Sequence, residues 1–312
     1  MAKGKRAWRG ARRAVIVLVV AQLAFIPPVV SPASGDPVLV GAGDIARCSS
    51  DGDEATALLI DQVVAAGGDV TVFTTGDNVY NSGSADEYAR CYEPSWGRHK
   101  ARTRPAPGNH DYRTPGAEGY YKYFGAAAGD PATGYYDYAK GAWQVVVLNS
   151  SCAAVGGCGP GSPQDQWLRA VLSASVSGCT LAIWHHPRFS SSSQHGSSHG
   201  LEPFWQTLYE FGADVVLGGH DHVYERFAPQ TGAGVADGDF GIRQFTVGSG
   251  GGSHYGFGTS VPNSEVRNND TSGVLKLTLR SGGYDWEFLP EAGRSFTDAG
   301  TGTCHGLPSA AG

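Results

Sequence analysis

Five short polar clusters recur along this 312-residue sequence, and four of them directly follow an apolar run. They are Gly43-Asp44, Gly76–Tyr80, Gly108–Asp111, His185–Pro187 and Gly219–His222. Each cluster sets a glycine or proline beside a side chain that can bind a metal. In open α/β sheets, ligands bind in the loops at the carboxyl ends of the strands. The pattern therefore predicts a layered α/β protein whose binding residues meet at one sheet edge.

The apolar periodicity along the chain gives the expected elements. Strands are predicted over 37–40, 69–75, 143–148, 180–184 and 214–217, and helices over 53–66, 163–174 and 201–211. Strands without intervening helices are predicted over 243–247, 273–279 and 284–289. Alternating strands and helices imply a parallel or mixed sheet covered by helices. The later strands are suited to a second sheet packed on the first.

The first 34 residues have the features of an export signal. A basic stretch precedes the apolar run Ala14–Ile26, which Pro27-Pro28 ends, and the small residues Ser31–Gly35 follow. A run of 13 residues is shorter than a membrane-spanning helix needs. We expect a signal peptide over 1–34, secretion, and no stable membrane association after cleavage. The paired arginines Arg12-Arg13 also permit twin-arginine export, and an uncleaved anchor is the alternative.

The six cysteines form an even set in a chain with an export signal, without CxxC or zinc-finger spacing. Disulfides are therefore expected, although six cysteines allow fifteen pairings. We predict Cys48 with Cys91, Cys152 with Cys158, and Cys179 with Cys304. The alternative is a set of reduced, buried cysteines.

The charge balance argues against binding of nucleic acid by a basic patch. Residues 1–34 hold six of the 23 Lys and Arg and none of the 29 Asp and Glu, so the remainder carries −12. An acidic chain repels polyanions over most of its surface. If the ligand is an anion, a local cation must attract it, and a bound metal is the obvious candidate.

The clusters together offer seven side chains that commonly bind metals. These are Asp44, Asp77, Tyr80, Asn109, His185, His220 and His222. Seven ligands are too many for one tetrahedral ion but suit two ions about 3.5–4 Å apart, with one carboxylate bridging. Oxygen donors mixed with imidazoles favour Fe, Mn or Zn. His220 and His222 alternate, so both should reach one site if the segment is extended.

Ordinary structural roles exist for each of these residues. Asp44 and Asp77 could cap helices, and Asn109 could occupy a turn. His185 could be a hydrogen-bonded core histidine, and Tyr80 a core or interface aromatic residue. Five such clusters in one chain favour the metal site over these separate explanations.

Two glycine- and serine-rich stretches are expected to be loops near the site. Residues 190–200 (SSSSQHGSSHG) predict a mobile loop that carries His195. Residues 248–252 (GSGGG) lack the Lys-Ser/Thr of a phosphate-binding P-loop. We therefore predict a flexible loop at the rim there.

The order GD, GDxxY, GNHD, HxP and GHDH resembles the calcineurin-like metallophosphoesterases. Tyr80, at the fourth position of GDxxY, resembles the purple acid phosphatase branch, in which this tyrosine binds ferric iron. The first motif, Asp44-Ile45-Ala46, departs from the D-x-H of many relatives, which agrees with Tyr80 replacing that histidine. The resemblance covers residues 39 to about 250.

The resemblance implies an α/β (α+β) fold, a four-layer αββα sandwich of two mixed β-sheets flanked by helices. Residues 35–312 would form a single metallophosphoesterase catalytic domain. The resemblance also implies a role for each ligand. Fe(III) would be bound by Asp44, Tyr80 and His222. The second ion, Fe(II), Zn or Mn, would be bound by Asn109, His185 and His220, and Asp77 would bridge the two ions. His185 is preferred to His186 because Pro187 completes H-x-P. His110 and His195 would be catalytic.

The implied activity is hydrolysis of phosphate monoesters on a small phosphorylated substrate. Two ions would lower the pKa of a bound water, and the resulting hydroxide would attack phosphorus while a histidine stabilises charge or protonates the leaving group. A first alternative is cleavage of diesters, nucleotides or phospholipid head groups at the same site. A second is a non-catalytic protein that binds metal or phosphate. The oligomeric state is not predicted.

Overall fold

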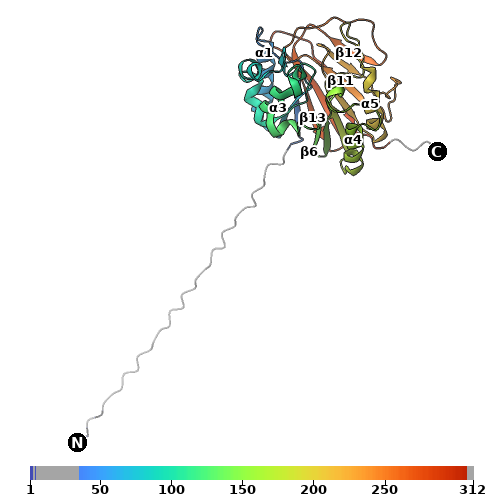
Figure 1. Ribbon diagram of the computed structural model, residues 1–312. Coiled ribbons are helices and arrows are strands. Elements are labelled where there is room, and N and C mark those ends of the chain that lie inside the picture. The colour runs from blue at the N-terminus through green and yellow to red at the C-terminus, as the bar shows by residue number, and fades with distance from the viewer. Residues whose placement is uncertain (3, 5–34, 308–312) are drawn as a thin grey trace, which may run out of the picture. The chain divides into compact units, whose positions relative to one another are not determined.

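Two mixed β-sheets form the centre of the protein (Figure 1). The computed structural model describes residues 1–2, 4 and 35–307, so all but three residues of the predicted signal peptide lie outside the described residues. The first sheet has six strands, with parallel pairing among the three strands at one end and antiparallel pairing through the C-terminal strands at the other. Their order is β15 (Ala299–Thr303), β14 (Gly283–Pro290), β13 (Gly273–Arg280), β1 (Val38–Ala42), β3 (Val70–Thr74) and β5 (Thr103–Arg104).

The second sheet has seven strands and is parallel through its four central members. Their order is β12 (Ser264–Asn268), β10 (Tyr224–Phe227), β11 (Arg243–Val247), β9 (Val215–Gly218), β8 (Cys179–Ile183), β7 (Trp143–Val147) and β6 (Tyr136–Lys140). A separate two-stranded pair joins β2 (Ala46–Arg47) to β4 (Val79–Tyr80).

Helices cover the outer faces of the sheets. They are α1 (Gly52–Ala65), α2 (Ala85–Glu87), α3 (Glu118–Phe124), α4 (Pro163–Ala174) and α5 (Glu202–Glu210), with short 3-10 turns and one π turn between them. The N-terminus of α4 is specified locally, because the Ser162 side chain accepts from the Asp165 N–H and Pro163 takes the first turn. In Figure 1, α1 and α3 lie on one side of the strands and α4 and α5 on the other.

The alternation of side chains along β7 shows why four layers form. Val145 and Val147 pack in the core shared with β1 and β13, whereas Val146 and Leu148 pack against α4 and α5. Successive side chains of a strand point to opposite faces, so this strand is buried on both. Strands β8 and β9 divide their side chains between the same two clusters. The predicted α/β sandwich of two mixed sheets and flanking helices is confirmed.

The three disulfides have the predicted pairing, Cys48–Cys91, Cys152–Cys158 and Cys179–Cys304. The third closes a loop of 125 residues and ties the segment after β15 to the start of β8. Long closed loops restrict the unfolded chain most, so this bond is expected to be the most stabilising of the three.

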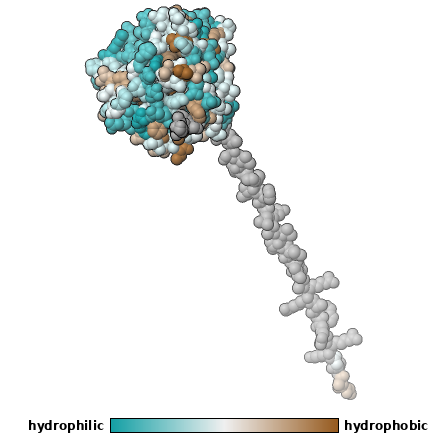
Figure 2. Space-filling model, turned by 90° about the vertical axis from the view of Figure 1, so that its right-hand side faces the viewer, coloured by the Kyte–Doolittle hydropathy of each residue, from teal (hydrophilic) through white to brown (hydrophobic). Residues whose placement is uncertain are grey.

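The surface of the described residues carries scattered rather than clustered large apolar side chains. The most exposed within residues 35–307 are Leu58, Val176, Val235 and Leu307, which lie on different elements. The face in Figure 2 is mostly hydrophilic, with separate hydrophobic residues. None of the described helices is long and apolar enough to cross a membrane.

Candidate metal centre

The predicted ligands come from the carboxyl ends of strands in both sheets. Asp44 follows β1, Asp77 follows β3 and Asn109 follows β5, all from the parallel part of the first sheet. His185 follows β8, and His220 and His222 follow β9 in the second sheet. The packing of the two sheets brings these edges together, so residues 178 positions apart in sequence share one cluster.

Three of these residues have left-handed backbone conformations. The φ angles of Asp44, Asp77 and His220 are 59°, 50° and 69°. Residues other than glycine adopt positive φ uncommonly, and such conformations concentrate at functional sites. The extended conformation expected over 220–222 is therefore wrong. The His220 and His222 side chains still reach the cluster, but from a sharply bent loop in which the Asp221 N–H donates to the Gly219 carbonyl.

One half of the cluster is arranged around the Tyr80 hydroxyl. Its Oη lies 2.7 Å from Oδ1 of Asp44 and 2.9 Å from Nε2 of His222. The same Oη lies 3.2 Å from Oδ2 of Asp77. All four side chains are buried, with Asp44 completely inaccessible.

The other half is arranged around His185. Its Nε2 lies 3.0 Å from Oδ1 of Asn109, 3.2 Å from Nδ1 of His220 and 3.3 Å from Oδ2 of Asp77. Oδ2 of Asp77 is thus the atom that both halves share. Ligand atoms of Asp44, Asp77 and His185 all lie within 4.8 Å of one another. This arrangement matches two adjacent sites joined by one carboxylate.

The hydrogen-bond partners of the histidines suit a cation-binding site. Nδ1 of His185 lies 2.8 Å from the Thr75 carbonyl oxygen, which can only accept, so Nδ1 carries the proton of the neutral ring and Nε2 of that form can bind a cation. Nδ1 of His222 is held in the same way by the Ser253 carbonyl oxygen. A backbone partner that fixes the tautomer is typical of metal-binding histidines. Ligands about 2.1 Å from an ion lie about 3 Å apart when adjacent, which is the spacing found here.

The electrostatics of the cluster favour positive charge at its centre. Burial alone would lower the pKa of His185, but the Asp77 carboxylate more than offsets this and raises it to about 9. Burial would raise the pKa of Asp77, yet His185 holds it below its usual range. Burial, then Asp44 and Asp77, raise the pKa of Tyr80 well above its ordinary value. Buried carboxylates of this kind need a cationic partner.

His110 and His195, predicted as catalytic, lie at the edge of the cluster. The His110 N–H donates to Oδ1 of Asp77 over 2.7 Å, its Nδ1 lies 2.7 Å from the Asn81 carbonyl oxygen, and its Nε2 lies 3.9 Å from Oδ2 of Asp77. The exposed His195 ring lies 4.2 Å, centroid to centroid, from that of His220. Both imidazoles can therefore reach a molecule bound over the two halves.

Two further side chains, Tyr255 and Asp111, support the ligands. The Tyr255 ring stacks on His222 with centroids 4.0 Å apart. Asp111, the last residue of GNHD, accepts from the Gly108 N–H, the Asn78 amide and the Tyr88 hydroxyl, so it fixes the loop that carries Asn109. The Asp111 role was readable from its motif, but nothing in the sequence linked Tyr255 to His222.

The glycines at 248–252 form a packed support, so the predicted flexible rim is wrong. These residues are buried, and a Cβ at Gly248 would collide with the Asp221 carbonyl. The Gly252 N–H donates to the Asp44 carbonyl over 2.8 Å, and the Gly250 N–H donates to the Gly43 carbonyl over 2.9 Å. Glycine is required because two backbones approach closely here.

Comparison with known proteins places this geometry in a family. The sequence profile of the calcineurin-like phosphoesterases matches residues 38–224. Purple acid phosphatase 15 of Arabidopsis thaliana is 32% identical over 104 residues, which are 32% of this chain and 19% of that protein. The chain thus spans about a fifth of that relative's length.

Solved structures with related folds agree with the layered architecture. The purple acid phosphatase PPD1 from yellow lupin (Lupinus luteus) seeds superposes with a TM-score of 0.69 at 17% identity, covering 88% of this chain and 55% of that one. GAP50, described as the anchor in the inner membrane complex of Plasmodium, superposes with a TM-score of 0.63 at 15% identity, covering 88% and 90%. The profile matches more than half of the chain, so the chain belongs to the calcineurin-like phosphoesterase family.

Proposed function

We propose that this protein is a secreted phosphatase that hydrolyses phosphate monoesters at a two-metal site. The observation that carries the proposal is the position of Asp77, whose Oδ2 faces both Tyr80 and His185 at 3.2–3.3 Å. A single carboxylate oxygen shared by two sets of ligands is suited to bridging two ions. Similarity to purple acid phosphatases supports the choice of reaction.

The residues divide between two metals as the motifs suggest. Asp44, Tyr80 and His222 hold one ion, assigned as Fe(III), because a phenol is a hard anionic ligand when ionised. Asn109, His185 and His220 hold the other, assigned as Fe(II), Zn or Mn. When bound, the two ions polarise the phosphoryl oxygens and make an attacking water acidic enough to react near neutral pH.

His110 and His195 act on the substrate rather than on the ions. The Asn81 carbonyl keeps the proton of His110 on Nδ1, so its Nε2 donates a hydrogen bond only when the ring is charged. Burial lowers the pKa of His110, so an anion bound beside it would favour the charged form, which stabilises charge that develops on a phosphoryl oxygen. His195, exposed beside His220, is placed to give a proton to the leaving alkoxide.

Secretion is supported by the three disulfides and by the basic-apolar leader. Disulfides persist mainly in oxidising compartments outside the cytosol. The proposed partner is a small phosphorylated molecule, without nucleic acid and without a membrane. The proposed organisation is a signal peptide over 1–34 and one catalytic domain from residue 35.

A second candidate is a non-catalytic binding protein, because the fold is similar to that of GAP50, an anchor by description. The purified mature protein should be assayed with p-nitrophenyl phosphate and bis(p-nitrophenyl) phosphate after metal loading. A higher kcat/KM for the monoester supports the proposal, whereas a higher value for the diester indicates a phosphodiesterase. No turnover of either ester with two ions bound indicates the binding protein.

A further inference from the structure

Arg47 lies directly beside the candidate metal centre and belongs to none of its motifs. Its guanidinium carbon lies 4.3 Å from the centroid of the Tyr80 ring. The backbones of these residues are paired across β2 and β4, and the adjacent Cys48 is tied to Cys91. The guanidinium is therefore held in place by cation–π contact, strand pairing and a nearby disulfide.

This charge has no counter-ion in the part of the chain that the structure describes. Nε of Arg47 is buried without a hydrogen-bond partner there. Most other arginines of residues 35–307 pair with carboxylates, as Arg98 does with Glu54 and Arg226 with Asp298. A guanidinium that is held in place without a carboxylate partner is suited to binding an anion.

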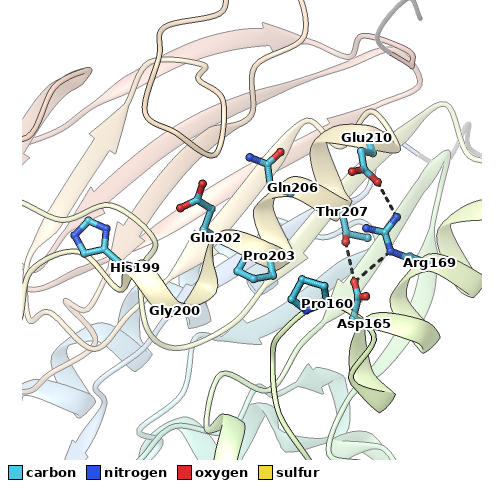
Figure 3. Close-up of a pocket in the computed structure, with 10 residues that line it drawn as sticks. All are labelled: Pro160, Asp165, Arg169, His199, Gly200, Glu202, Pro203, Gln206, Thr207 and Glu210. Carbon is cyan, nitrogen blue, oxygen red and sulfur yellow. Dashed lines mark hydrogen bonds and ion pairs between the residues drawn. The ribbon is translucent and has the colours of Figure 1, made fainter.

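Arg169, in contrast to Arg47, is an arginine whose charge is paired with carboxylates. Arg169 lines a pocket of about 440 Å³ between α4 and α5, which we call the α4–α5 pocket. Its Nη1 lies 2.7 Å from Glu210 and its Nε lies 3.4 Å from Asp165, as the dashed lines in Figure 3 mark. Two of its nitrogens thus face carboxylates, so the charge of Arg169 is paired within the helix pair.

Tyr255 adds an aromatic side chain at the edge of the cluster. Its ring stacks on His222 with centroids 4.0 Å apart and lies 5.6 Å from the His195 ring.

We infer that Arg47 is a specificity residue that binds a second anionic group on the substrate, beyond the phosphoryl group that is cleaved. This inference rests on the proposed function. The scissile phosphoryl group would be held by the two ions and His110, whereas Arg47 stands outside the ligand cluster, across the Tyr80 ring. The substrates favoured are thus phosphate esters that carry a further phosphoryl group or carboxylate.

The test compares wild type with Arg47→Gln and Arg47→Lys on three substrates, measuring released phosphate. These are p-nitrophenyl phosphate, which has no second anion, fructose 1,6-bisphosphate, a monoester with a second phosphoryl group, and phosphoglycolate, a monoester with a carboxylate. Arg47→Gln is expected to lower kcat/KM for fructose 1,6-bisphosphate or phosphoglycolate roughly ten- to a hundredfold, the factor of one charged hydrogen bond. The kcat/KM of Arg47→Gln for p-nitrophenyl phosphate should change less than threefold. Arg47→Lys should lose less kcat/KM than Arg47→Gln on the substrates with a second anion. The substrate whose kcat/KM falls in Arg47→Gln identifies the kind of anion that Arg47 binds.

Arg104→Gln is the matched control, because Arg104 also stacks on a tyrosine, Tyr138, but that ring belongs to β6 and not to the cluster. Calorimetry adds a readout without turnover: pyrophosphate should bind wild type more tightly than inorganic phosphate, and Arg47→Gln should remove the difference. Equal losses on all three substrates, or no loss on any, would overturn the inference. If wild type cleaves no ester yet keeps the Arg47-dependent preference for pyrophosphate, the proposed function fails and the anion site stands.

Discussion

The metal cluster and the α4–α5 pocket are both rich in charged residues, yet they satisfy their polar groups in opposite ways. In the α4–α5 pocket, Asp165 accepts from the Thr207 hydroxyl and the Gly161 N–H and lies beside Arg169. In the metal cluster, the ligand atoms of Asp77, Asn109 and His185 converge on one another at 3.0–3.3 Å. Buried carboxylates are costly unless a positive charge lies beside them. The comparison teaches that charges paired with fixed side chains indicate architecture, whereas converging ligand atoms indicate a site for a bound cation.

The substitution Asp77→Asn should break the metal cluster most completely. The amide cannot supply a bridging anion to both halves, so metal content and activity should both fall, with kcat/KM lower by roughly a thousandfold or more. Elemental analysis and an ester assay measure the two effects. Activity near that of wild type would show that Asp77 is not the bridge.

The substitution Tyr80→Phe should affect one half and spare the other. It removes one oxygen ligand without changing the ring, so affinity for the ion of that half should fall roughly ten- to a hundredfold or more. The fold should survive because the ring still fills its buried site. Competition with a chelator measures the affinity. Equal loss of both ions would contradict the division of ligands.

The matched substitution in the α4–α5 pocket is Asp165→Asn. Asp165 is buried and hydrogen-bonded but has no ligand role, so the expected result is a loss of about 1–3 kcal/mol in the free energy of unfolding. The kcat/KM of the folded fraction should match that of wild type. Urea unfolding measures the stability and an ester assay measures kcat/KM. A large drop in kcat/KM with a normal fold would contradict the conclusion that the α4–α5 pocket has only a structural role.

The smallest expected effect is on stability and concerns Glu87. Its carboxylate accepts from the Asn81 N–H, and the Asn81 carbonyl oxygen contacts Nδ1 of His110. Burial opposes the ionisation of Glu87, but hydrogen bonds from Ser84, Ser82 and Asn81 lower its pKa to about 2. A lowered pKa stabilises the fold above the ordinary value of 4.5, and that contribution is lost as pH falls toward 2. Glu87→Gln should therefore unfold at lower urea than wild type at pH 7, with the gap narrowing at pH 3. A gap independent of pH would refute the ionic role.

Much of the fold could be predicted because its central elements have strong local patterns. The structure places α4 and β11 at the predicted bounds, since Ser162-Pro163 starts the helix and apolar residues form the strand. Strand β12 was missed because its sequence, SEVRN, is polar and has no buried residue. Helix α3 was missed because it is seven residues long and lies among short turns.

The candidate site was likewise predictable where the signal is local in sequence and not where it depends on the folded chain. Asp44, Asp77 and His220 were accessible to sequence reasoning because each follows a glycine near a strand end. The left-handed backbone at these residues was not, because it depends on how neighbouring loops hold them. Arg47 and Ser253 also escaped prediction, since their contacts with Tyr80 and His222 exist only after the chain folds.

The most direct test of the account is the metal content of the purified mature protein, measured by elemental analysis together with its visible spectrum. We expect two ions per chain, at least one of them iron, and a visible absorption band that disappears in Tyr80→Phe. One ion per chain, or none after loading with iron, zinc and manganese, would contradict the claim that Asp77 joins two adjacent sites.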